Sequence, residues 1–414
     1  MKILVLSLVF PPDNVSTAHI VGRLAHEFVE RGHEVVVLTS TPHYHPDPLD
    51  ARAGLTPVFG RLVCRSGSPG LTAYHVWMPP KNRPLGWRLL AWFWFHLITA
   101  VLGCVVGRRA SVILAPTPPL TIGCEAWWLG RWHRIPFVYN VQEVHPDVAF
   151  ALGAVRRPWL IRWLKRLESW VYARAAYITV IGSGMRDNLL AKGVPERKLE
   201  IISNFVDPDE LPIRPRVNPF GVSHGLVDRF VVSYAGNLGV PQGLTTVLDA
   251  ASLLASCTEI VFVLIGDGSA AGDLQRRAAQ QHLTNVTFLP FQPYSAVPDI
   301  YAASDISLVP QAEGTGLYGL PSKIYRIMAC GRPILGICDP TSEVAELITR
   351  ADCGGVVGPN DPEALARAVR RAYDDRASWN NKGARGRQFV VEQFSVNRVA
   401  EAYTALLTRA ASGR

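Results

Sequence analysis

Two series of short apolar segments, each alternating with helical segments, run through this chain and are separated by a proline-rich stretch. The first series opens with a continuous apolar run at residues 3–9, and the second opens at residues 230–234. Apolar strands that alternate with helices are typical of parallel sheets covered on both faces. Residues 207–229 contain four prolines and little periodicity, which favours a linker. The sequence therefore predicts an α/β fold of two Rossmann-like domains that face a central cleft.

The same pattern sets the expected domain boundaries. At 414 residues, the chain is too long for one ordinary core. We expect a first domain over residues 1–207, a linker over 208–229, a second domain over 230–395 and a helical segment over 396–414.

The composition indicates a globular protein with an anionic partner. Hydrophobic residues make up 48% and charged residues 18%, which is unlike a disordered chain, and the net charge is +8. We do not expect nucleic acid, because no helix-turn-helix, finger or RNP-type motif occurs. Acidic lipid and a phosphorylated substrate stay open. The seven cysteines are scattered without a CxxC pair, so that neither zinc nor a disulfide framework is expected and a reducing cytosol fits best.

Residues 317–334 in the second series have the features of a phosphate site. Pro321 suits the first turn of a helix, where its missing N–H would have no partner. Ser322 and Lys323 then lie where free backbone N–H groups and the positive end of the helix dipole favour a phosphate. The helix is expected to end at Gly331. We therefore predict that Pro321, Ser322 and Lys323 contact a phosphate group.

The loop after the strand at residues 230–234 is a second candidate for phosphate contact. Its glycines allow close approach of the backbone, and its amide side chains can hydrogen-bond a phosphate or a sugar. The alternative is a structural turn. A further strand end, at residues 266–268, has Asp-Gly turn chemistry, which alone is a weak signal. The candidates in these two loops are Gly236, Asn237, Gly239, Gln242, Gly266 and Asp267.

Two strand ends of the first series carry polar residues. The loop at residues 10–19 is either a plain loop or one that lets a sugar or phosphate approach its backbone. Glu143, His145 and Asp147 follow the strand at residues 137–141, where acid, base or sugar-hydroxyl contacts are expected. The alternatives are a structural role for His145 and a helix N-cap for Asp147. Residues 42–48 include two histidines and an aspartate, which are residue types of a metal site. Three prolines interrupt that segment, and we expect no metal there. The histidines are His43 and His45, and the aspartate is Asp47.

Two segments indicate contact with a membrane surface. Residues 89–106 form an eighteen-residue apolar run with four consecutive aromatic residues and flanking arginines, at the lower limit of length for a membrane span. Aromatic residues with flanking arginines prefer the membrane interface. Residues 156–174 are basic with three interleaved tryptophans, the composition of a helix that lies on a surface. The alternative for both is a core helix with snorkelling arginines. We expect peripheral membrane contact.

Six motifs occur in a characteristic order along the chain. They are Phe10-Pro-Pro with the following Arg31-Gly-His-Glu-Val-Val-Val-Leu-Thr39, Ala115-Pro-Thr-Pro-Pro119, Val141-Gln-Glu-Val-His-Pro-Asp147, Gly236-Asn-Leu-Gly239, Pro321-Ser-Lys323 and Gly331-Arg-Pro333. In this order they resemble a GT-B glycosyltransferase of the retaining family four, over essentially the whole chain. The similarity is greatest to a branch with colanic-acid and O-antigen transferases, which act on amino- or deoxysugars.

The resemblance implies that the second domain binds a nucleoside diphosphate sugar, that the first binds the acceptor, and that the helix at 396–414 crosses back to the first domain. Donor contacts would then come from the two phosphate-site candidates and from Glu313, and Glu143 and His145 would face the acceptor hydroxyl. Further acceptor contacts would come from the loop at 10–19, through Asn14, Ser16, Thr17 and His19.

The chain departs from the family pattern at several positions. The family commonly has arginine and lysine where this chain has Asn237 and Gln242, which leaves the phosphate charge to Lys323, with Arg326 or Arg332 as further candidates. Of two glutamates eight residues apart in the family, Glu313 can keep the first role, and an arginine, Arg326, takes the place of the second. The residues Glu143 and His145 stand where the branch has aspartate and tryptophan.

The expected activity is transfer of a sugar, with retention, from a nucleoside diphosphate sugar to a lipid-linked acceptor in bacterial surface polysaccharide biosynthesis, which covers lipopolysaccharide and exopolysaccharide. We expect neither cofactor nor metal, and a cytoplasmic enzyme at the inner face of the cell membrane. One alternative is a nucleotide-sugar 2-epimerase of the same fold, and another is a non-catalytic nucleotide-sugar-binding protein.

Overall fold

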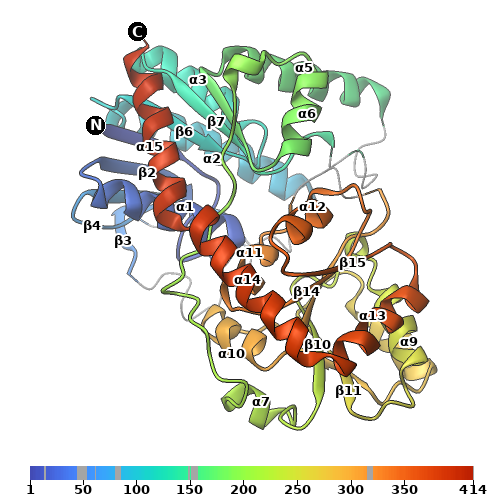
Figure 1. Ribbon diagram of the computed structural model, residues 1–414. Helices are drawn as coiled ribbons and strands as arrows, with labels where there is room; N and C mark the ends of the chain where they lie inside the picture. Colours follow the sequence, from blue (N-terminus) through green and yellow to red (C-terminus); the bar gives the residue numbers. More distant parts are fainter. Residues whose placement is uncertain are drawn as a thin grey trace. The chain divides into compact units, whose positions relative to one another are not determined.

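The computed structural model describes residues 1–13, 15–43, 54–60, 62–79, 85–147, 150, 157–314 and 320–413. The chain divides into two compact units (Figure 1). Met1–Ser203 and Val396–Arg414 make up the first unit, and Asn204–Ser395 makes up the second. The segment 208–229, which we expected as a linker, is part of the second unit and contains the short helix α7 (Pro219–Ser223).

The first unit is built on a sheet in which nine strands are described, in the order β3-β4-β5-β2-β1-β6-β7-β8-β9. The seven strands from β5 to β9 in this order are parallel, whereas β3 and β4 form an antiparallel extension at one edge. The strands are β1 (Lys2–Leu6), β2 (Glu34–Ser40), β3 (Thr56–Phe59), β4 (Val63–Ser68), β5 (Leu71–Val76), β6 (Val112–Pro116), β7 (Phe137–Val141), β8 (Tyr177–Val180) and β9 (Leu199–Ile201).

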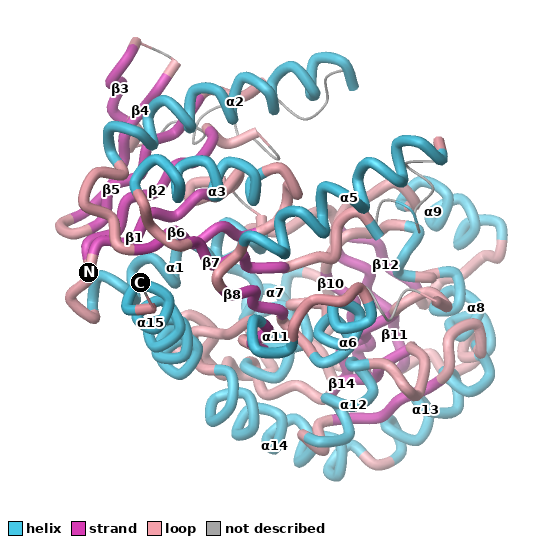
Figure 2. Tube along the Cα trace, turned by 90° about the horizontal axis from the view of Figure 1, so that it is seen from above, coloured by secondary structure: helices cyan, strands magenta, loops and turns pink. Residues whose placement is uncertain are grey.

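Helices cover both faces of this sheet (Figure 2). The helix α3 is a neighbour of both α2 and α5, and these three lie on one face. The helices α1 and α15 pack together on the opposite face, where α15 also contacts β6 and β7. The described helices of this unit are α1 (Ser16–Glu30), α2 (Leu85–Val106), α3 (Ile122–His133), α5 (Pro158–Arg174), α6 (Ser183–Ala191) and α15 (Val396–Ser412), with a 3-10 turn at Glu196–Lys198.

The helix α15 joins the first unit because its apolar residues recur every three or four positions and so form one buried stripe. Tyr403, in the middle of this stripe, also accepts a hydrogen bond from Asn140 Nδ2 at 2.8 Å. At the first turn of α15, Nη2 of Arg31, the residue that follows α1, donates to the carbonyl oxygen of Asn397 at 3.0 Å. The expected return of the last helix to the first domain is confirmed.

The second unit is built on a parallel sheet in which six strands are described, in the order β12-β11-β10-β13-β14-β15. These strands are β10 (Phe230–Ala235), β11 (Ile260–Ile265), β12 (Val286–Leu289), β13 (Ile306–Pro310), β14 (Ile334–Ile337) and β15 (Gly354–Val357). The helices between and after them are α8 (Thr245–Leu253), α9 (Ala271–Gln280), α10 (Val297–Ala302), α11 (Lys323–Ala329), α12 (Glu343–Arg350), α13 (Pro362–Asp374) and α14 (Arg376–Phe394), and 3-10 turns lie at Val240–Gln242 and Tyr294–Ala296.

The central strand β10 shows why apolar residues do not alternate with polar ones along these strands. Phe230, Val232 and Tyr234 pack into the core on one face of the sheet. Val231, between them, packs into a separate core on the other face. Because successive side chains of a strand point to opposite faces, a strand covered on both sides needs apolar residues at every position. The predicted fold class, two Rossmann-like α/β domains, is confirmed.

Strand order reverses direction once in each sheet. In the second unit, β10 lies between β11, which follows it in sequence, and β13. In the first unit, β1 lies in the same way between β2 and β6. Ligands of open α/β sheets bind outside the carboxyl ends of the strands at such a reversal. The loops after β10 and β13, and those after β1 and β6, are therefore where each unit is expected to hold a ligand.

Candidate functional site

In the second unit, the residue at the start of α11 is a lysine, Lys323, whose ammonium group lies against an aromatic ring. The ammonium nitrogen of Lys323 lies 3.7 Å from the centre of the Tyr234 ring. Among the residues that the structure describes, no carboxylate forms an ion pair with Lys323. Burial, together with the nearby positive charge of Arg326, lowers the pKa of Lys323 to about 7. A half-buried ammonium group on an aromatic face, with no carboxylate, is suited to an anionic ligand.

The glycine loop after β10 lies directly against this lysine. Gly236 has a φ of +147°, and a Cβ added there would lie 2.7 Å from Lys323 Nζ. A side chain at position 236 would therefore displace the ammonium group. The predicted phosphate contacts Gly236 and Lys323, which are far apart in sequence, are brought together.

A second turn, after β11, packs on the same loop. Gly266 has a φ of +139°, and a Cβ there would lie 1.9 Å from the carbonyl oxygen of Gly236. The backbone N–H of Leu238 donates to the carbonyl oxygen of Asp267 at 2.9 Å. Gly266 is thus required by the close approach of the Gly236 backbone, and Gly236 by its positive φ and the adjacent Lys323 side chain.

The polar side chains of these loops have partners of their own. The Gln242 Oε1 atom accepts a hydrogen bond from the N–H of Gly239 at 3.2 Å, so that this amide stabilises its own loop. Asp267 Oδ1 accepts from the N–H of Gly268 at 2.7 Å. The side chain of Asn237 lies beside these two turns, since a Cβ on Gly268 would be 2.5 Å from its Oδ1 atom.

The loop after β13 is tied to the glycine loop. The N–H of Ala312 donates to the carbonyl oxygen of Pro241 at 2.8 Å. The next residue, Glu313, is exposed and accepts a hydrogen bond from Asn360 Nδ2 at 3.2 Å. Pro321 and Ser322 are half-buried and immediately precede α11. Residues 315–319, between these two groups, lie outside the described part of the chain.

A pocket of about 490 Å³ borders the glycine loop. It is bounded by Gly239 and Gly243 and by residues of α8 and α9, among them Arg276 and Arg277. Both arginines already pair with carboxylates, Arg276 with Asp273 and Arg277 with Asp249. Since Lys323 does not line this pocket, we do not place the predicted phosphate site there.

In the first unit, two of the three predicted titratable residues after β7 lie together. His145 Nε2 is 3.2 Å from Glu143 Oε2, and the carboxylate is about half exposed. Asp147 instead pairs with Lys192 Nζ at 2.8 Å, and the same ammonium group contacts Glu168 at 2.6 Å. Asp147 is therefore held in an ion-pair network of the scaffold, whereas Glu143 and His145 stay available at the strand end.

The predicted acceptor loop, at residues 10–19, runs into the first turn of α1. Ser16, Thr17 and His19 occupy the first turn of α1 and are half-buried. Asn14 lies outside the described residues.

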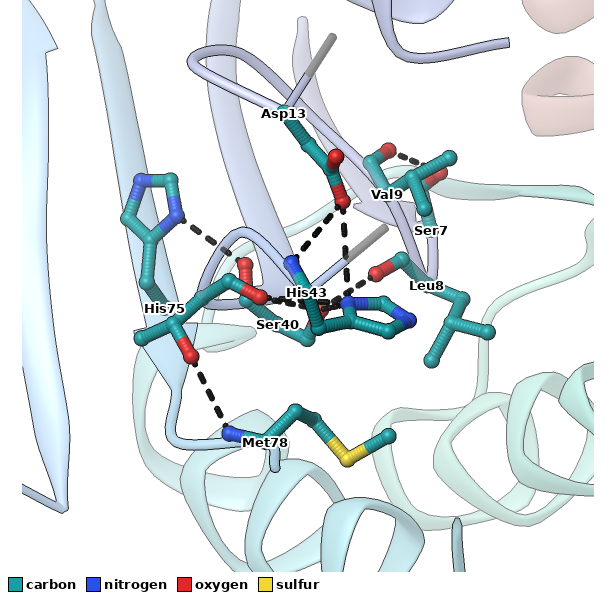
Figure 3. A network of polar contacts seen from close by, with 9 residues as sticks. Ser7, Leu8, Val9, Asp13, Ser40, His43, His75 and Met78 are labelled. Atoms are coloured by element: carbon teal, nitrogen blue, oxygen red, sulfur yellow. Dashed lines mark hydrogen bonds and ion pairs between the residues drawn. The ribbon is translucent and has the colours of Figure 1, made fainter. Parts of the chain in front are cut away.

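A buried polar pair that the sequence did not predict joins Asp13 of this loop to His43 (Figure 3). Asp13 and His43 follow β1 and β2, which are adjacent in the sheet. The N–H of His43 donates to Asp13 Oδ2 at 3.4 Å, and His43 Nδ1 lies 3.6 Å from the same oxygen. Ser40 Oγ is 2.9 Å from His43 Nδ1 and donates to the carbonyl oxygen of Leu8 at 2.8 Å. These contacts give the first unit a second imidazole–carboxylate pair at the carboxyl edge of its sheet.

A second histidine in the same network is held neutral. His75 Nδ1 is 3.2 Å from the carbonyl oxygen of Ser40, and its Nε2 is 2.7 Å from Ser66 Oγ. Burial lowers the pKa of His75 to about 4 despite the opposing effect of the Ser40 carbonyl. Within the described ranges, no group of three or more histidine, cysteine or acidic residues could hold a metal ion, and His45 and Asp47 lie outside those ranges.

Comparison with known proteins agrees with this architecture. Residues 17–204 match a glycosyl transferase 4-like domain, and residues 229–375 match glycosyl transferases group 1. WbjE of Pseudomonas aeruginosa, named as a glycosyltransferase, is 30% identical over 296 residues, which cover 70% of this chain and 72% of WbjE. WcaI of Escherichia coli K12, named for colanic acid biosynthesis, is 24% identical over 392 residues, which cover 90% of this chain and 92% of WcaI.

Solved structures share the fold at low sequence identity. Sucrose-phosphate synthase from Thermosynechococcus elongatus has a TM-score of 0.76 at 16% identity and covers 100% of both chains. Anabaena HepE, solved in complex with UDP, has a TM-score of 0.70 at 15% identity, over 99% of this chain and 100% of HepE. The fold is that of a GT-B glycosyltransferase. This chain belongs to the glycosyltransferase family defined by the 4-like and group 1 domains.

Proposed function

We propose that this glycosyltransferase moves a hexosyl group from a nucleoside diphosphate sugar to a lipid-linked acceptor in the synthesis of a bacterial surface polysaccharide. The observation that carries the donor assignment is Lys323, a half-buried ammonium group that lies against a glycine loop and pairs with no described carboxylate. Support for the donor class comes from HepE, a structure of the same fold that was solved with UDP-glucose. Support for the process comes from the name of WcaI. We do not favour the 2-epimerase, because the relatives are named as transferases.

In this proposal the second unit binds the donor through its diphosphate. Lys323 would neutralise the phosphate charge, and the backbone of the Gly236 loop and the N–H of Ser322 would donate hydrogen bonds to phosphate oxygens. Asn237 would add an amide, Glu313 would hold the ribose or the sugar, and the turn at 266–268 would border the nucleotide. Gln242 would act indirectly, because its Oε1 atom stabilises the loop.

The chemistry that we propose for these residues is stabilisation of the leaving group. As the bond between the sugar C1 and the diphosphate oxygen breaks, negative charge grows on the diphosphate. A preorganised ammonium group and backbone N–H donors lower the energy of that state. The acceptor oxygen forms its bond to C1 on the same face, and its proton passes to the departing diphosphate. The product therefore retains the donor's anomeric configuration, and no covalent enzyme intermediate is needed.

The first unit would bind the acceptor at the carboxyl edge of its sheet. Glu143 and His145 are placed to hydrogen-bond a sugar hydroxyl, since their side chains meet at 3.2 Å and are partly exposed. Ser16, Thr17 and His19 at the start of α1 would contact the rest of the acceptor. A lipid-linked acceptor resides in a bilayer, so we further propose that the enzyme works at the inner face of the cell membrane.

Thermal-shift binding tests the donor assignment. Wild type is titrated with UDP-, GDP- and dTDP-sugars, together with Lys323→Ala and the control Lys382→Ala, a lysine of the same unit that pairs with Asp352. A ligand that binds only the folded state raises the melting temperature. One nucleotide class should stabilise wild type and Lys382→Ala but not Lys323→Ala. An equal shift in all three proteins would move the diphosphate away from Lys323, and no shift with any donor would contradict the proposed function.

A further inference from the structure

The outer side of α2 is an uninterrupted apolar stripe. Its members are spaced three or four residues apart and are between 47% and 69% exposed. Over this span of the helix they cover a length of about 27 Å. The opposite side of α2 packs inward through Ala91, Phe95 and Thr99, all buried. Single exposed apolar residues are ordinary, but a contiguous row of this length marks an interaction site. The exposed residues are Trp87, Leu90, Phe93, Leu97, Val101 and Val105.

Exposed tryptophans extend this stripe across α3 and α5. On α3, Trp128 and Trp132 stack with ring centres 5.9 Å apart, and Trp132 is 62% exposed. On α5, Trp159 and Trp163 are each more than half exposed. Since α3 contacts both α2 and α5 on one face of the sheet, these rings belong to one layer, which Figure 2 shows on the side opposite α15. We call the exposed apolar residues of α2, α3 and α5 the aromatic face.

The described exposed ionic charges of these helices are all positive. The carboxylates of α3 and α5 are buried and have partners: Glu125 lies 2.6 Å from His96 Nδ1, and Glu168 lies 2.6 Å from Lys192 Nζ. Arg174 lies with its guanidinium 4.0 Å from the centre of the Trp170 ring. Exposed basic residues on these helices and on the turn after α2 include Arg108, Arg109, Arg131, Arg162, Lys165 and Arg166.

We propose that the aromatic face docks on an anionic lipid bilayer, with α2, α3 and α5 lying in the plane of the interface. Tryptophan prefers the boundary between lipid and water, and arginine and lysine are attracted to anionic headgroups. A second copy of the chain is a poorer occupant, because a two-fold interface would bring the same positive charges together. A span is not the arrangement either, since no helix in the described residues is long and apolar enough to cross a membrane. The inference extends the proposed function, in which the acceptor is lipid-linked.

Co-sedimentation with vesicles tests the docking. The vesicles contain phosphatidylethanolamine with phosphatidylglycerol, or phosphatidylcholine alone. The test variant Phe93→Ser is matched with Phe59→Ser, since both phenylalanines belong to the first unit and are 69% and 63% exposed. Arg162→Glu is matched in the same way with Arg197→Glu, an exposed arginine of the 3-10 turn after α6. Thermal melting establishes that all four variants are folded.

Wild type should bind the anionic vesicles, and binding should weaken about tenfold or more in Phe93→Ser. In Arg162→Glu it should weaken about fivefold or more, and this loss should diminish at high salt. Both controls should bind like wild type. Absence of wild-type binding, or equal losses in test and control variants, would overturn the proposal. A wild-type dimer that Phe93→Ser dissociates in size-exclusion chromatography would assign the face to a second copy instead.

Donor titration of the same preparations keeps this inference separate from the proposed function. Vesicle binding without any donor-induced thermal shift would support the docking face and contradict the proposed donor assignment. A donor shift without vesicle binding would do the reverse. The aromatic face lies in the first unit and Lys323 in the second, so that each variant should affect only one of the two measurements.

Discussion

The two units share a topology but present opposite chemistry at the carboxyl edge of their sheets. The edge of the second unit offers an ammonium group, close-packed glycines and backbone N–H groups, which suit an anion. The edge of the first unit offers the pairs Glu143–His145 and Asp13–His43, which suit hydroxyl groups. The reversal of strand order determines where a ligand binds, and the residues that follow each strand determine which ligand. Each prediction below tests one side of this comparison.

The largest effect is expected from Lys323, the cation of the second unit. Lys323→Ala should lower kcat by about a hundredfold to a thousandfold, because it removes a preorganised charge from the leaving group. Transfer assays with the donor identified by thermal shift measure this, with Lys382→Ala as the control. Full activity in Lys323→Ala would mean that another group neutralises the leaving diphosphate. The edge of the second unit would then not be distinguished from that of the first by this ammonium group.

The first unit should respond through turnover rather than donor binding. Glu143→Gln should lower kcat by about tenfold to a hundredfold at unchanged donor affinity, because the neutral amide accepts a weaker hydrogen bond from the acceptor hydroxyl than the carboxylate does. Asp147→Asn is the control: its carboxylate pairs with Lys192, so stability should fall while the turnover of folded enzyme persists. Kinetics at saturating donor, with donor titration in parallel, separate these outcomes. A loss of donor affinity in Glu143→Gln would place the residue with the donor instead.

The close packing of the glycine loops gives the third prediction. Gly266→Ala should destabilise the second unit by about 2 kcal/mol or more, because the new Cβ meets the carbonyl oxygen of Gly236 and the φ of +139° is strained. At Gly272 on α9 a Cβ would meet only Arg276 Nη1, at an ordinary contact distance of 3.6 Å, so Gly272→Ala should be neutral or stabilising by about 0.5–1 kcal/mol. Urea unfolding measures both. Equal stabilities of the two variants would show that the loops do not require their close approach.

The smallest effect is a pH dependence of donor binding. Because burial lowers the pKa of Lys323 to about 7, the lysine is mainly charged below pH 7 and mainly neutral above it. Binding a diphosphate requires the charged form, so donor affinity should be highest below pH 7 and fall as the pH rises, by at most about tenfold per unit. In the unfolded chain the lysine keeps its usual, higher pKa. The unliganded protein should therefore gain stability between pH 7 and the usual lysine range, relative to Lys323→Met. Affinity independent of pH from 6 to 9 would contradict this ionisation.

The sequence predicted the parallel core of both units because their strands are apolar at every position. It missed the antiparallel edge of the first sheet. All four residues of β3 are exposed, and β4 mixes polar residues with glycine, so that neither strand has an apolar pattern to detect. Such strands form because β5 offers a free edge to pair with, which is a tertiary effect.

Local motifs gave more information about the strand ends of the second unit than about those of the first. Pro321, Ser322 and Lys323 are adjacent in sequence, so that the start of a helix could be inferred from them directly. Asp13 and His43, in contrast, are brought together only because β1 and β2 are neighbours in register. The available signals were Pro-Pro-Asp after one strand and Pro-His after the next. Whether these two segments lie close together depends on the order of the strands in the sheet, which hydrophobic periodicity does not specify.

The helix α15 has a consequence for how the protein is made. The first unit is assembled from two stretches of chain, and the whole second unit is encoded between them. At ribosomal speed, translation of Asn204–Ser395 takes about 10 to 40 s. Throughout that interval, the surfaces of α1, β6 and β7 that α15 later covers remain uncovered. The nascent first unit therefore exposes surface of the kind that chaperones bind. The second unit can complete its fold before the first unit does.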